Sequence, residues 1–307
     1  ATQDQESLDI YYIDVEGGAA TLFVSPSGQS MLVDSGHPGS VDAERIAAVV
    51  REVGLDEINY LVTTHYHLDH VGGAPELSTR VPIKNFVDHG LPTTQELDSN
   101  QPLYEAYLTT RETGRHIVVR AGDTIPIEGL DVKVVSSREE FITTPLSGAG
   151  EPNPLCRDFS RQEETYISGG ENGRSVGLMI QYGDFRTINL GDLTWNREHK
   201  LVCPNNLLGT IDLYLTTHHG LSISGPKAIV HALRTPYLGC GDDDLARWRV
   251  HHGGTWNHQA PQPDGDESVD AVASGLAWLG EMHLRRHLLQ RRVVDQIGRL
   301  HRIGFHV

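Results

Sequence analysis

The stretch from His65 to His70 holds three histidines and one aspartate in six positions, in the pattern H-x-H-x-D-H. A lone surface histidine is usually a solvated side chain, but four ligand-type groups at this spacing predict a site for zinc or a similar divalent ion. Residues 58–63 just before it are apolar and β-branched, as in a buried strand. Residues 71–77 then turn and begin a helix. The ligands are therefore expected in a loop at the end of a strand, where α/β folds usually place their chemistry.

Two further groups of ligand-type residues follow predicted strands. Asp192 follows the strand at 186–190, where a carboxylate is well placed to bridge two metals; the alternative is that it caps the next helix. His218 and His219 follow the strand at 211–216, and the parallel with the first motif favours His218 as the ligand. His89, after the strand at 83–88, is a further candidate or an ordinary loop histidine. His116 and the histidines at 251, 252 and 258 rank lower, because no convincing strand precedes them.

The pattern of the chain predicts an α/β protein with two sheets packed face to face and helices outside. Strands at 8–15, 20–24 and 29–34 are expected to form an antiparallel meander, followed by a helix at 40–53. Residues 147–173 are rich in Gly, Pro and charge and predict a long surface loop. The remaining predictions are helices at 101–113, 195–201 and 226–233, strands at 117–119, 124–127, 130–135, 175–182 and 185–190, and one or two helices within 271–294. We predict a single domain over residues 1–307, with 235–307 as a divergent tail of uncertain structure.

Composition limits the classes of partner. The formal net charge of −16 argues against a general nucleic-acid binder but leaves a nuclease open, because bound metal supplies positive charge. No apolar run is long enough to cross a bilayer. We therefore expect a small-molecule substrate and no membrane, and the oligomeric state is left open.

The cysteines and the start of the chain give only weak indications of disulfide pairing and of localisation. Cys156, Cys203 and Cys240 are too few and too scattered to predict a disulfide framework, and their odd number leaves at least one without an internal disulfide partner. The chain starts at Ala1 without a signal-like segment. This is expected of a secreted or periplasmic protein after removal of its signal peptide, and equally of a cytoplasmic protein.

Together these motifs resemble the metallo-β-lactamase superfamily. The H-x-H-x-D-H run, the Gly191-Asp192 pair and the His218-His219-Gly220 run carry the resemblance. Residues 14–20, 26–28 and 32–36 resemble more specifically its ComEC-like branch, named after the hydrolase domain of a bacterial DNA-uptake protein. The resemblance covers roughly residues 8–235. It implies a four-layer αββα sandwich with two metal ions, usually zinc, with manganese or iron as alternatives.

Carried over position by position, the resemblance assigns His65 and His67 to the first metal. It assigns Asp69 and His70 to the second, together with His218 or His219, and Asp192 as the bridge. Many relatives supply another histidine to the first metal from the strand after a Gly-Asp-Thr turn. Here that turn is at 122–124, and the strand at 132–135 leads into Ser136-Ser137 with no histidine. Either His89 fills the place, or the first metal is short of a ligand and more weakly bound.

The leading hypothesis is a metal-dependent hydrolase, in which a hydroxide bridging two divalent metals attacks an ester-type bond. Asp69 and Asp192 are the candidate catalytic residues, with Asp69 orienting the nucleophile. Asp34 is expected either to support a ligand histidine or to cap the turn at Ser35. A phosphoester substrate is favoured by the branch; lactonase or β-lactamase activity is the alternative within hydrolysis. A di-iron redox protein of the same fold is a second class, although such members tend to carry Glu at the place of His67. A binding protein with a vestigial site is the third.

Overall fold

The computed structural model describes residues 7–163, 170–235, 237–239, 249–250 and 301–306, which belong to one compact unit of the chain. The helices predicted within 271–294 and the histidines at 251, 252 and 258 lie outside the described residues. The single domain over 1–307 stays a prediction. Within the described residues, no helix is both long and apolar enough to cross a membrane.

The first sheet has the strand order β14-β15-β1-β2-β3-β4-β5-β6. The antiparallel pairing of β1 with β2 and of β2 with β3 confirms the predicted meander. From β3 to β6 the strands are parallel, so β4 and β5 end at the same edge. In the C-terminal tail, β15 pairs antiparallel with β1. The bounds are β1 Ser7–Tyr12, β2 Thr21–Val24, β3 Ser30–Val33, β4 Ile58–Val62, β5 Ile83–Asp88, β6 Arg115–Val118, β14 Arg249–Val250 and β15 His301–His306.

The second sheet has the order β13-β12-β11-β10-β8-β7, with β9 paired to β8. The strands β11, β12 and β13 are parallel, so β11 and β12 also end at a common edge. The bounds are β7 Thr124–Ile125, β8 Asp131–Ser137, β9 Glu140–Phe141, β10 Gly177–Tyr182, β11 Phe185–Asn189, β12 Leu213–Leu215 and β13 Tyr237–Gly239.

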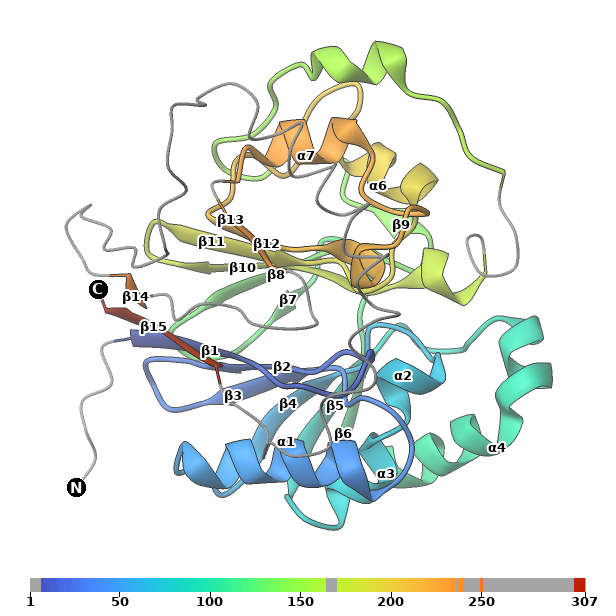
Figure 1. Ribbon diagram of the computed structural model, residues 1–307, viewed down its shortest axis with the longest axis vertical. Helices are drawn as coiled ribbons and strands as arrows, with labels where there is room; N and C mark the ends of the chain where they lie inside the picture. Colours follow the sequence, from blue (N-terminus) through green and yellow to red (C-terminus); the bar gives the residue numbers. More distant parts are fainter. Residues whose placement is uncertain (1–6, 164–169, 236, 240–248, 251–300, 307) are drawn as a thin grey trace, which may run out of the picture. The chain divides into compact units, whose positions relative to one another are not determined.

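Helices cover the outer face of each sheet, as Figure 1 shows for α1 and α3 on the first and α6 and α7 on the second. One apolar cluster fills the space between the sheets, and one lies between each sheet and its helices. The predicted αββα sandwich is thereby confirmed. The bounds are α1 Ser40–Glu52, α2 Leu68–Val71, α3 Ala74–Ser78, α4 Thr94–Arg111, α6 Trp195–Val202 and α7 Lys227–Leu233, with short 3-10 helices η1 Pro154–Asp158, η2 Glu171–Arg174 and η3 Thr217–Gly220.

Helix α4 begins earlier than the predicted helix at 101–113. Asn100 has non-helical backbone angles, and Pro102 follows it inside the helix. Proline lacks the amide proton that an uninterrupted helix needs. The helical spacing in the sequence is therefore recognisable only after this break. The Thr93 hydroxyl accepts from the Glu96 amide and caps the early part.

Residues 147–163 and 170–173 of the predicted surface loop at 147–173 are described, and several of them are buried, which corrects the sequence interpretation. Cys156 forms a disulfide with Cys203 at the end of α6, a single bridge that the cysteine spacing did not predict. The Asn153 amide donates to two backbone carbonyls, of Val202 and Ala228. Such buried polar side chains satisfy backbone groups that would otherwise need water, and so allow an irregular segment to pack inside.

Candidate metal centre

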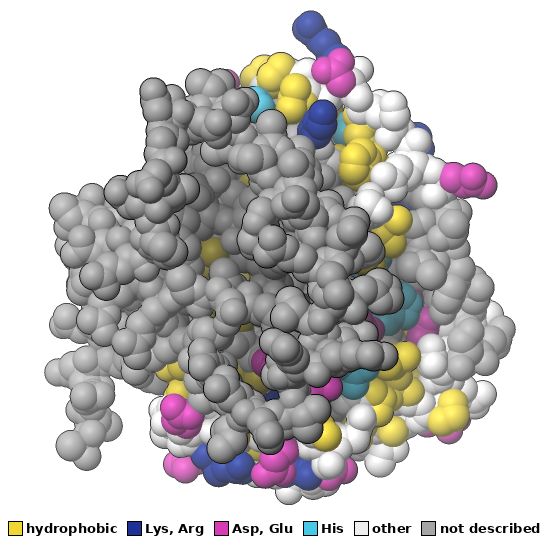
Figure 2. Space-filling view, in the orientation of Figure 1, with side chains coloured by type: hydrophobic (Ala, Val, Ile, Leu, Met, Phe, Trp, Pro, Cys, Tyr) yellow, Lys and Arg dark blue, Asp and Glu magenta, His cyan; other side chains and the backbone are white. Residues whose placement is uncertain are grey.

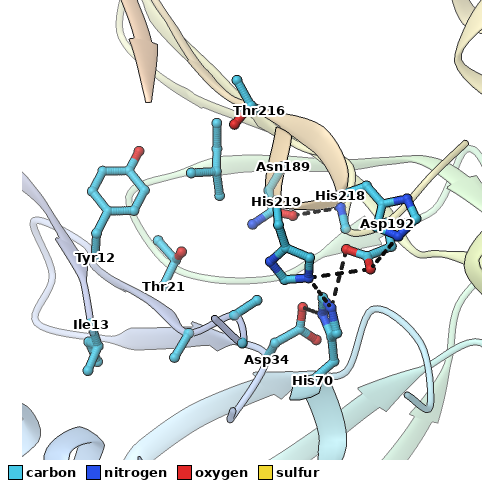
Figure 3. Close-up of a pocket in the computed structure, with 15 residues that line it drawn as sticks. Tyr12, Ile13, Thr21, Asp34, His70, Asn189, Asp192, Thr216, His218 and His219 are labelled. Atoms are coloured by element: carbon cyan, nitrogen blue, oxygen red, sulfur yellow. Dashed lines mark hydrogen bonds and ion pairs between the residues drawn. The ribbon is translucent and has the colours of Figure 1, made fainter. Parts of the chain in front are cut away.

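The ends of β4, β11 and β12 bring the histidines and carboxylates of the three motifs together. Figure 3 shows His70, Asp192, His218 and His219 converging from both sheets. His65 and His70 are almost completely buried, and Asp192 is 4% exposed. Figure 2 shows histidine and acidic side chains reaching the surface close together on one face. Of the residues predicted as ligands, all but His89 lie in this cluster.

Asp192 lies at the centre of the cluster. Its Oδ2 is 3.4 Å from His218 Nε2, 3.5 Å from His219 Nε2 and 3.8 Å from His65 Nε2. Its Oδ1 is 3.2 Å from His70 Nε2. Both carboxylate oxygens therefore face imidazole nitrogens, as a carboxylate shared between two cations requires.

The donor atoms around Asp192 form two groups that share His70: one holds His65, His70 and Asp192, and the other Asp69, His70 and His219. His65 Nε2 also lies 3.1 Å from His67 Nδ1. In the second group, His219 Nε2 is 3.2 Å from His70 Nε2 and 3.3 Å from Asp69 Oδ2. Two ligands of a tetrahedral zinc ion with bonds of about 2.0–2.2 Å lie about 3.3–3.6 Å apart. The donor spacing in this chain is close to that range, so the residues fit divalent ions.

The outer hydrogen bonds of the rings fix which nitrogen of each ring faces the centre. The Thr64 hydroxyl donates to Asp34 Oδ2, so it must accept from Nδ1 of His65 at 3.1 Å. Asp34 Oδ2 also accepts from His70 Nδ1 at 2.8 Å. Both rings therefore present Nε2 to the centre. Such outer hydrogen bonds fix the orientation of a ligand histidine.

His67 is oriented in the opposite sense. Its Nε2 lies 3.4 Å from Glu96 Oε2, so its Nδ1 is the nitrogen left to face His65. Glu96 is 2% exposed and comes from α4, outside every motif that the sequence pointed to.

Asp34 supports the ligands rather than only capping a turn. It binds His70, and its Oδ1 accepts from the Thr64 amide at 2.8 Å. Its backbone has φ of 62°, which is unusual for a residue other than glycine. Of the two roles expected for Asp34, the contacts favour the positioning of His70.

The turn after β12 carries two consecutive histidines in the left-handed region, with φ of 55° at His218 and 54° at His219. Each such conformation costs a non-glycine residue about 1–2 kcal/mol. In an extended strand, successive side chains point to opposite faces. The left-handed pair instead brings both imidazoles within ion-pair distance of one oxygen of Asp192. Strain of this kind is typical of functional sites.

Gly191 is needed for the position of Asp192. Its φ is 54°, and a Cβ there would lie 2.8 Å from the Thr64 side chain. A larger residue would push Thr64 from the ring of His65. The Gly191 carbonyl also accepts from the His218 amide at 3.1 Å, which ties the second and third motifs together.

Charges in the centre shift the ligand pKa values in opposite directions. Burial opposes protonation of His219, but hydrogen bonds to Asp192 and Asp69 raise its pKa to about 9. Burial likewise opposes protonation of His70, whose pKa Asp192 and Asp34 nevertheless raise well above the ordinary value. Burial lowers the pKa of His65 and of His218. For Asp69, burial is outweighed by His219 and His70, and the pKa falls to about 2.

Metal binding is therefore expected to release protons. At neutral pH, His70 and His219 carry protons before a cation binds, since their pKa values are raised. At pH values below the pKa of the histidine that loses its proton, the apparent affinity for the metal ion should rise with pH. The rise should be up to about tenfold per pH unit for each proton displaced. Calorimetric zinc titrations in buffers of different ionisation enthalpy would count the protons. An affinity that stays constant between pH 6 and pH 8 would contradict this prediction.

Two histidines proposed or ranked from sequence lie elsewhere. His89 Nε2 binds Glu171 Oε1 at 2.7 Å, and both side chains are fully buried. His89 is thus held by a carboxylate from the 147–173 segment and does not reach His65 and His67. His116 Nε2 binds Asp88 at 3.0 Å. These contacts tie β5 and β6 to their neighbours.

Sequence reasoning missed two polar side chains that touch His218. Asn172 Nδ2 lies 3.1 Å from His218 Nε2, and Ser224 Oγ lies 3.2 Å from His218 Nδ1. Both are buried. Asn172 belongs to a stretch that composition marked as surface loop, and the only signal for Ser224 was its closeness to the His-His-Gly run.

Residues 13–151 match the family model described as the Metallo-beta-lactamase superfamily. No curated protein gave a significant match. Among solved structures, a metallo-β-lactamase with a HARLDQ motif from Cronobacter sakazakii is 14% identical, with 60% of each chain covered and a TM-score of 0.37. The metallo-β-lactamase fold protein YhfI from Bacillus subtilis is 14% identical, with 68% of this chain and 70% of that chain covered and a TM-score of 0.42. A variant of the CmlA β-hydroxylase is 15% identical, with 78% of this chain and 46% of that chain covered and a TM-score of 0.43.

Proposed function

We propose, from the premise that this chain has the metallo-β-lactamase fold and matches that superfamily's model over residues 13–151, that it is a hydrolase dependent on two divalent metal ions. One observation carries the proposal. Imidazole nitrogens surround both oxygens of Asp192 at 3.2–3.8 Å. His65 lies beside His67, and His219 lies beside Asp69 and His70, so the donor atoms form two neighbouring groups.

Two ions held here would lower the pKa of a water molecule between them towards neutrality and withdraw charge from the bond under attack. The chain's own residues supply the orientation. Asp69 is 25% exposed, so it can accept a hydrogen bond from the attacking water as well as hold an ion. Asp34 and Thr64 keep the rings of His70 and His65 fixed during the reaction.

A pocket beside His70, Asp192 and His219 is the proposed place of the substrate. Figure 3 shows Tyr12, Thr21, Asn189 and Thr216 lining it. None of the described residues that line it is a lysine or arginine, so with these residues an anionic substrate would depend on the metal ions for charge compensation. Hydroxyl and amide groups suit the oxygens of a small ester.

Within the hydrolases we propose a phosphoester as substrate, and we propose that the chain belongs to the ComEC-like branch. Residues 14–20, 26–28 and 32–36, together with Gly191-Asp192 and the His-His-Gly run, support the branch. The acidic balance of the chain argues for a small phosphoester rather than long DNA. Zinc is the proposed ion, because the donor set is rich in imidazole.

A panel of chromogenic substrates tests this proposal. The zinc-loaded protein is expected to hydrolyse bis(p-nitrophenyl) phosphate faster than p-nitrophenyl acetate, an aryl lactone or a chromogenic cephalosporin. His67→Ala should lose this activity, because His67 lies beside His65 and is proposed to hold the first metal ion with it. Turnover of the lactone or cephalosporin alone would reject the phosphoester. A protein that purifies with iron and hydrolyses nothing would reject the hydrolase.

Tyr12→Phe tests the pocket. Burial raises the pKa of Tyr12, so its phenol stays protonated and can donate to a substrate oxygen. Loss of one such hydrogen bond costs about 1 kcal/mol, which corresponds to a rise in KM of roughly fivefold with little change in kcat. Steady-state kinetics with the best substrate of the panel would measure it, and Tyr60→Phe, at a tyrosine whose hydroxyl donates to Pro126 O, is the matched control. An unchanged KM would place the substrate elsewhere.

A further inference from the structure

A further group of ligand-type side chains shares no residue with the candidate metal centre. It consists of Cys156, His199 and Cys203, whose sulfur atoms and one ring nitrogen all lie within 4.8 Å of one another. His199 belongs to the last turn of α6, and Cys203, four residues later, is the C-cap of the same helix. This spacing favours one helix face for both side chains. Cys156 belongs to η1 and is joined to Cys203 by the disulfide.

Hydrogen bonds hold Cys156 beside Cys203 independently of the disulfide. Asn153, three residues before Cys156, binds the carbonyls of the two residues that flank Cys203. Its backbone amide donates to the Pro204 carbonyl at 3.0 Å, and its side-chain amide donates to the Val202 carbonyl at 3.2 Å. The Asn153 side chain is buried, so water does not compete readily for these bonds. The two cysteines are therefore expected to stay close together after the bond between their sulfur atoms is reduced.

His199 has the orientation and the charge state of a metal ligand. Its ring stacks on Phe159, with the centroids 3.7 Å apart and the planes at 21°. Its Nε2 is buried and has no hydrogen-bond partner among the described residues, which is uncommon for a buried polar atom. Burial lowers the pKa of His199 and the charge of Arg161 lowers it further, so the ring is neutral at neutral pH. Arg161 opposes a cation at this place, but two thiolates would supply two negative charges.

We propose that Cys156, His199 and Cys203, once the disulfide is reduced, form a metal site separate from the two-metal centre, for zinc or another thiophilic divalent ion. A dithiol supplies two electrons and two protons, becomes a disulfide itself and leaves two thiols in the chain. The ion then displaces both thiol protons and binds two thiolates and one neutral imidazole, with water as a fourth ligand.

The site is accessible to both reagents. All three side chains belong to half-buried residues, so a dithiol and an ion can reach them from solvent. Disulfides persist under oxidising conditions, whereas reducing conditions keep thiols free to bind metal. The 147–163 part of the chain is thus linked to the end of α6 by a disulfide in one case and by an ion in the other.

Cobalt(II) binding to the full chain tests the site, because thiolate ligands give a charge-transfer band in the near ultraviolet that imidazole and carboxylate ligands do not give. All variants carry Cys240→Ser, which leaves Cys156 and Cys203 as the only cysteines. The protein is reduced with a dithiol and separated from it without oxygen. The reduced protein is expected to show the band and to bind one more equivalent of cobalt than the disulfide-bonded protein, which should show no band.

His199→Ala tests the third ligand. Loss of a ligand should weaken cobalt binding at least as much as loss of an outer partner, by about 10–100-fold. The disulfide-bonded variant keeps its cross-link, so circular dichroism before and after reduction separates loss of binding from loss of the fold. His231→Ala, at a half-buried histidine in the last turn of α7, is the matched control and should bind cobalt as the parent does.

The inference is overturned if the reduced protein shows no thiolate band, or if His199→Ala binds the additional cobalt ion as tightly as His231→Ala. A parent protein that unfolds on reduction would also overturn it, because the hydrogen bonds of Asn153 would then not hold the two cysteines together.

Discussion

Asp192→Asn is expected to remove both metal ions and all measurable hydrolysis. Among the residues that the structure describes, Asp192 is the one carboxylate that faces His65, His70, His218 and His219 together. An amide keeps the shape but loses the charge and one acceptor. Replacing an outer partner of a ligand already costs about 10–100-fold in metal affinity, so loss of the bridging ligand should cost more than about 100-fold for each ion.

The measurement is metal content by mass spectrometry together with hydrolysis at saturating substrate. Asp184→Asn is the matched control, because Asp184 is exposed in the turn between β10 and β11, at the opposite end of β11 from Asp192. Circular dichroism would show that Asp192→Asn remains folded. Wild-type metal content and turnover in Asp192→Asn would refute the bridging role.

Glu198→Gln is expected to stabilise the protein at alkaline pH. Glu198 is fully buried in α6, where it accepts from the Gly225 amide at 2.6 Å and from the Tyr214 hydroxyl at 3.2 Å. Burial outweighs these hydrogen bonds and raises its pKa from 4.5 to about 7. The fold therefore prefers the neutral carboxyl group.

The pH dependence follows from that direction. The neutral form contributes its full stability below about pH 4.5, and this contribution is lost as the pH rises through about 7. One pKa unit corresponds to about 1.4 kcal/mol, so the loss amounts to up to about 3 kcal/mol. Glutamine stays neutral and should be more stable than the wild type by that amount at pH 8, with little difference at pH 5.

Denaturant unfolding at the two pH values would measure the difference. Glu52→Gln, at an exposed glutamate at the end of α1, controls for the substitution itself. A Glu198→Gln protein that is equally stable or less stable at pH 8 would show that the carboxylate is charged in the fold and well compensated.

The fold and most of the ligand set could be predicted from the sequence, because their signals are local. The run from His65 to His70 follows an apolar strand, and the same arrangement recurs at Asp192 and at His218. Parallel strands bring their ends to one edge, so three strand-end motifs predict one centre. The alternation and helical spacing of apolar residues predicted the two sheets and the outer helices.

The remaining features depend on contacts between distant segments. His89 has the same local signal as a ligand, but Glu171, 82 residues away, binds it. Cys156 pairs with Cys203, 47 residues further along the chain, and Asn172 is buried, although the composition of residues 147–173 resembles that of a surface loop. The choice between His218 and His219 depends on left-handed backbone angles that no residue type in the run would predict.

The most direct test of the two-metal hydrolase is a zinc titration of the metal-depleted chain in which bound zinc and hydrolysis of bis(p-nitrophenyl) phosphate are measured together. The centre predicts that two equivalents bind per chain, and that activity reaches its full value only when the second is bound. Asp192 faces His65 as well as His70 and His219, so both ions should depend on it and neither ion alone should restore the wild-type rate. Binding of two equivalents without any hydrolysis, or full activity in the metal-depleted chain, would contradict the account.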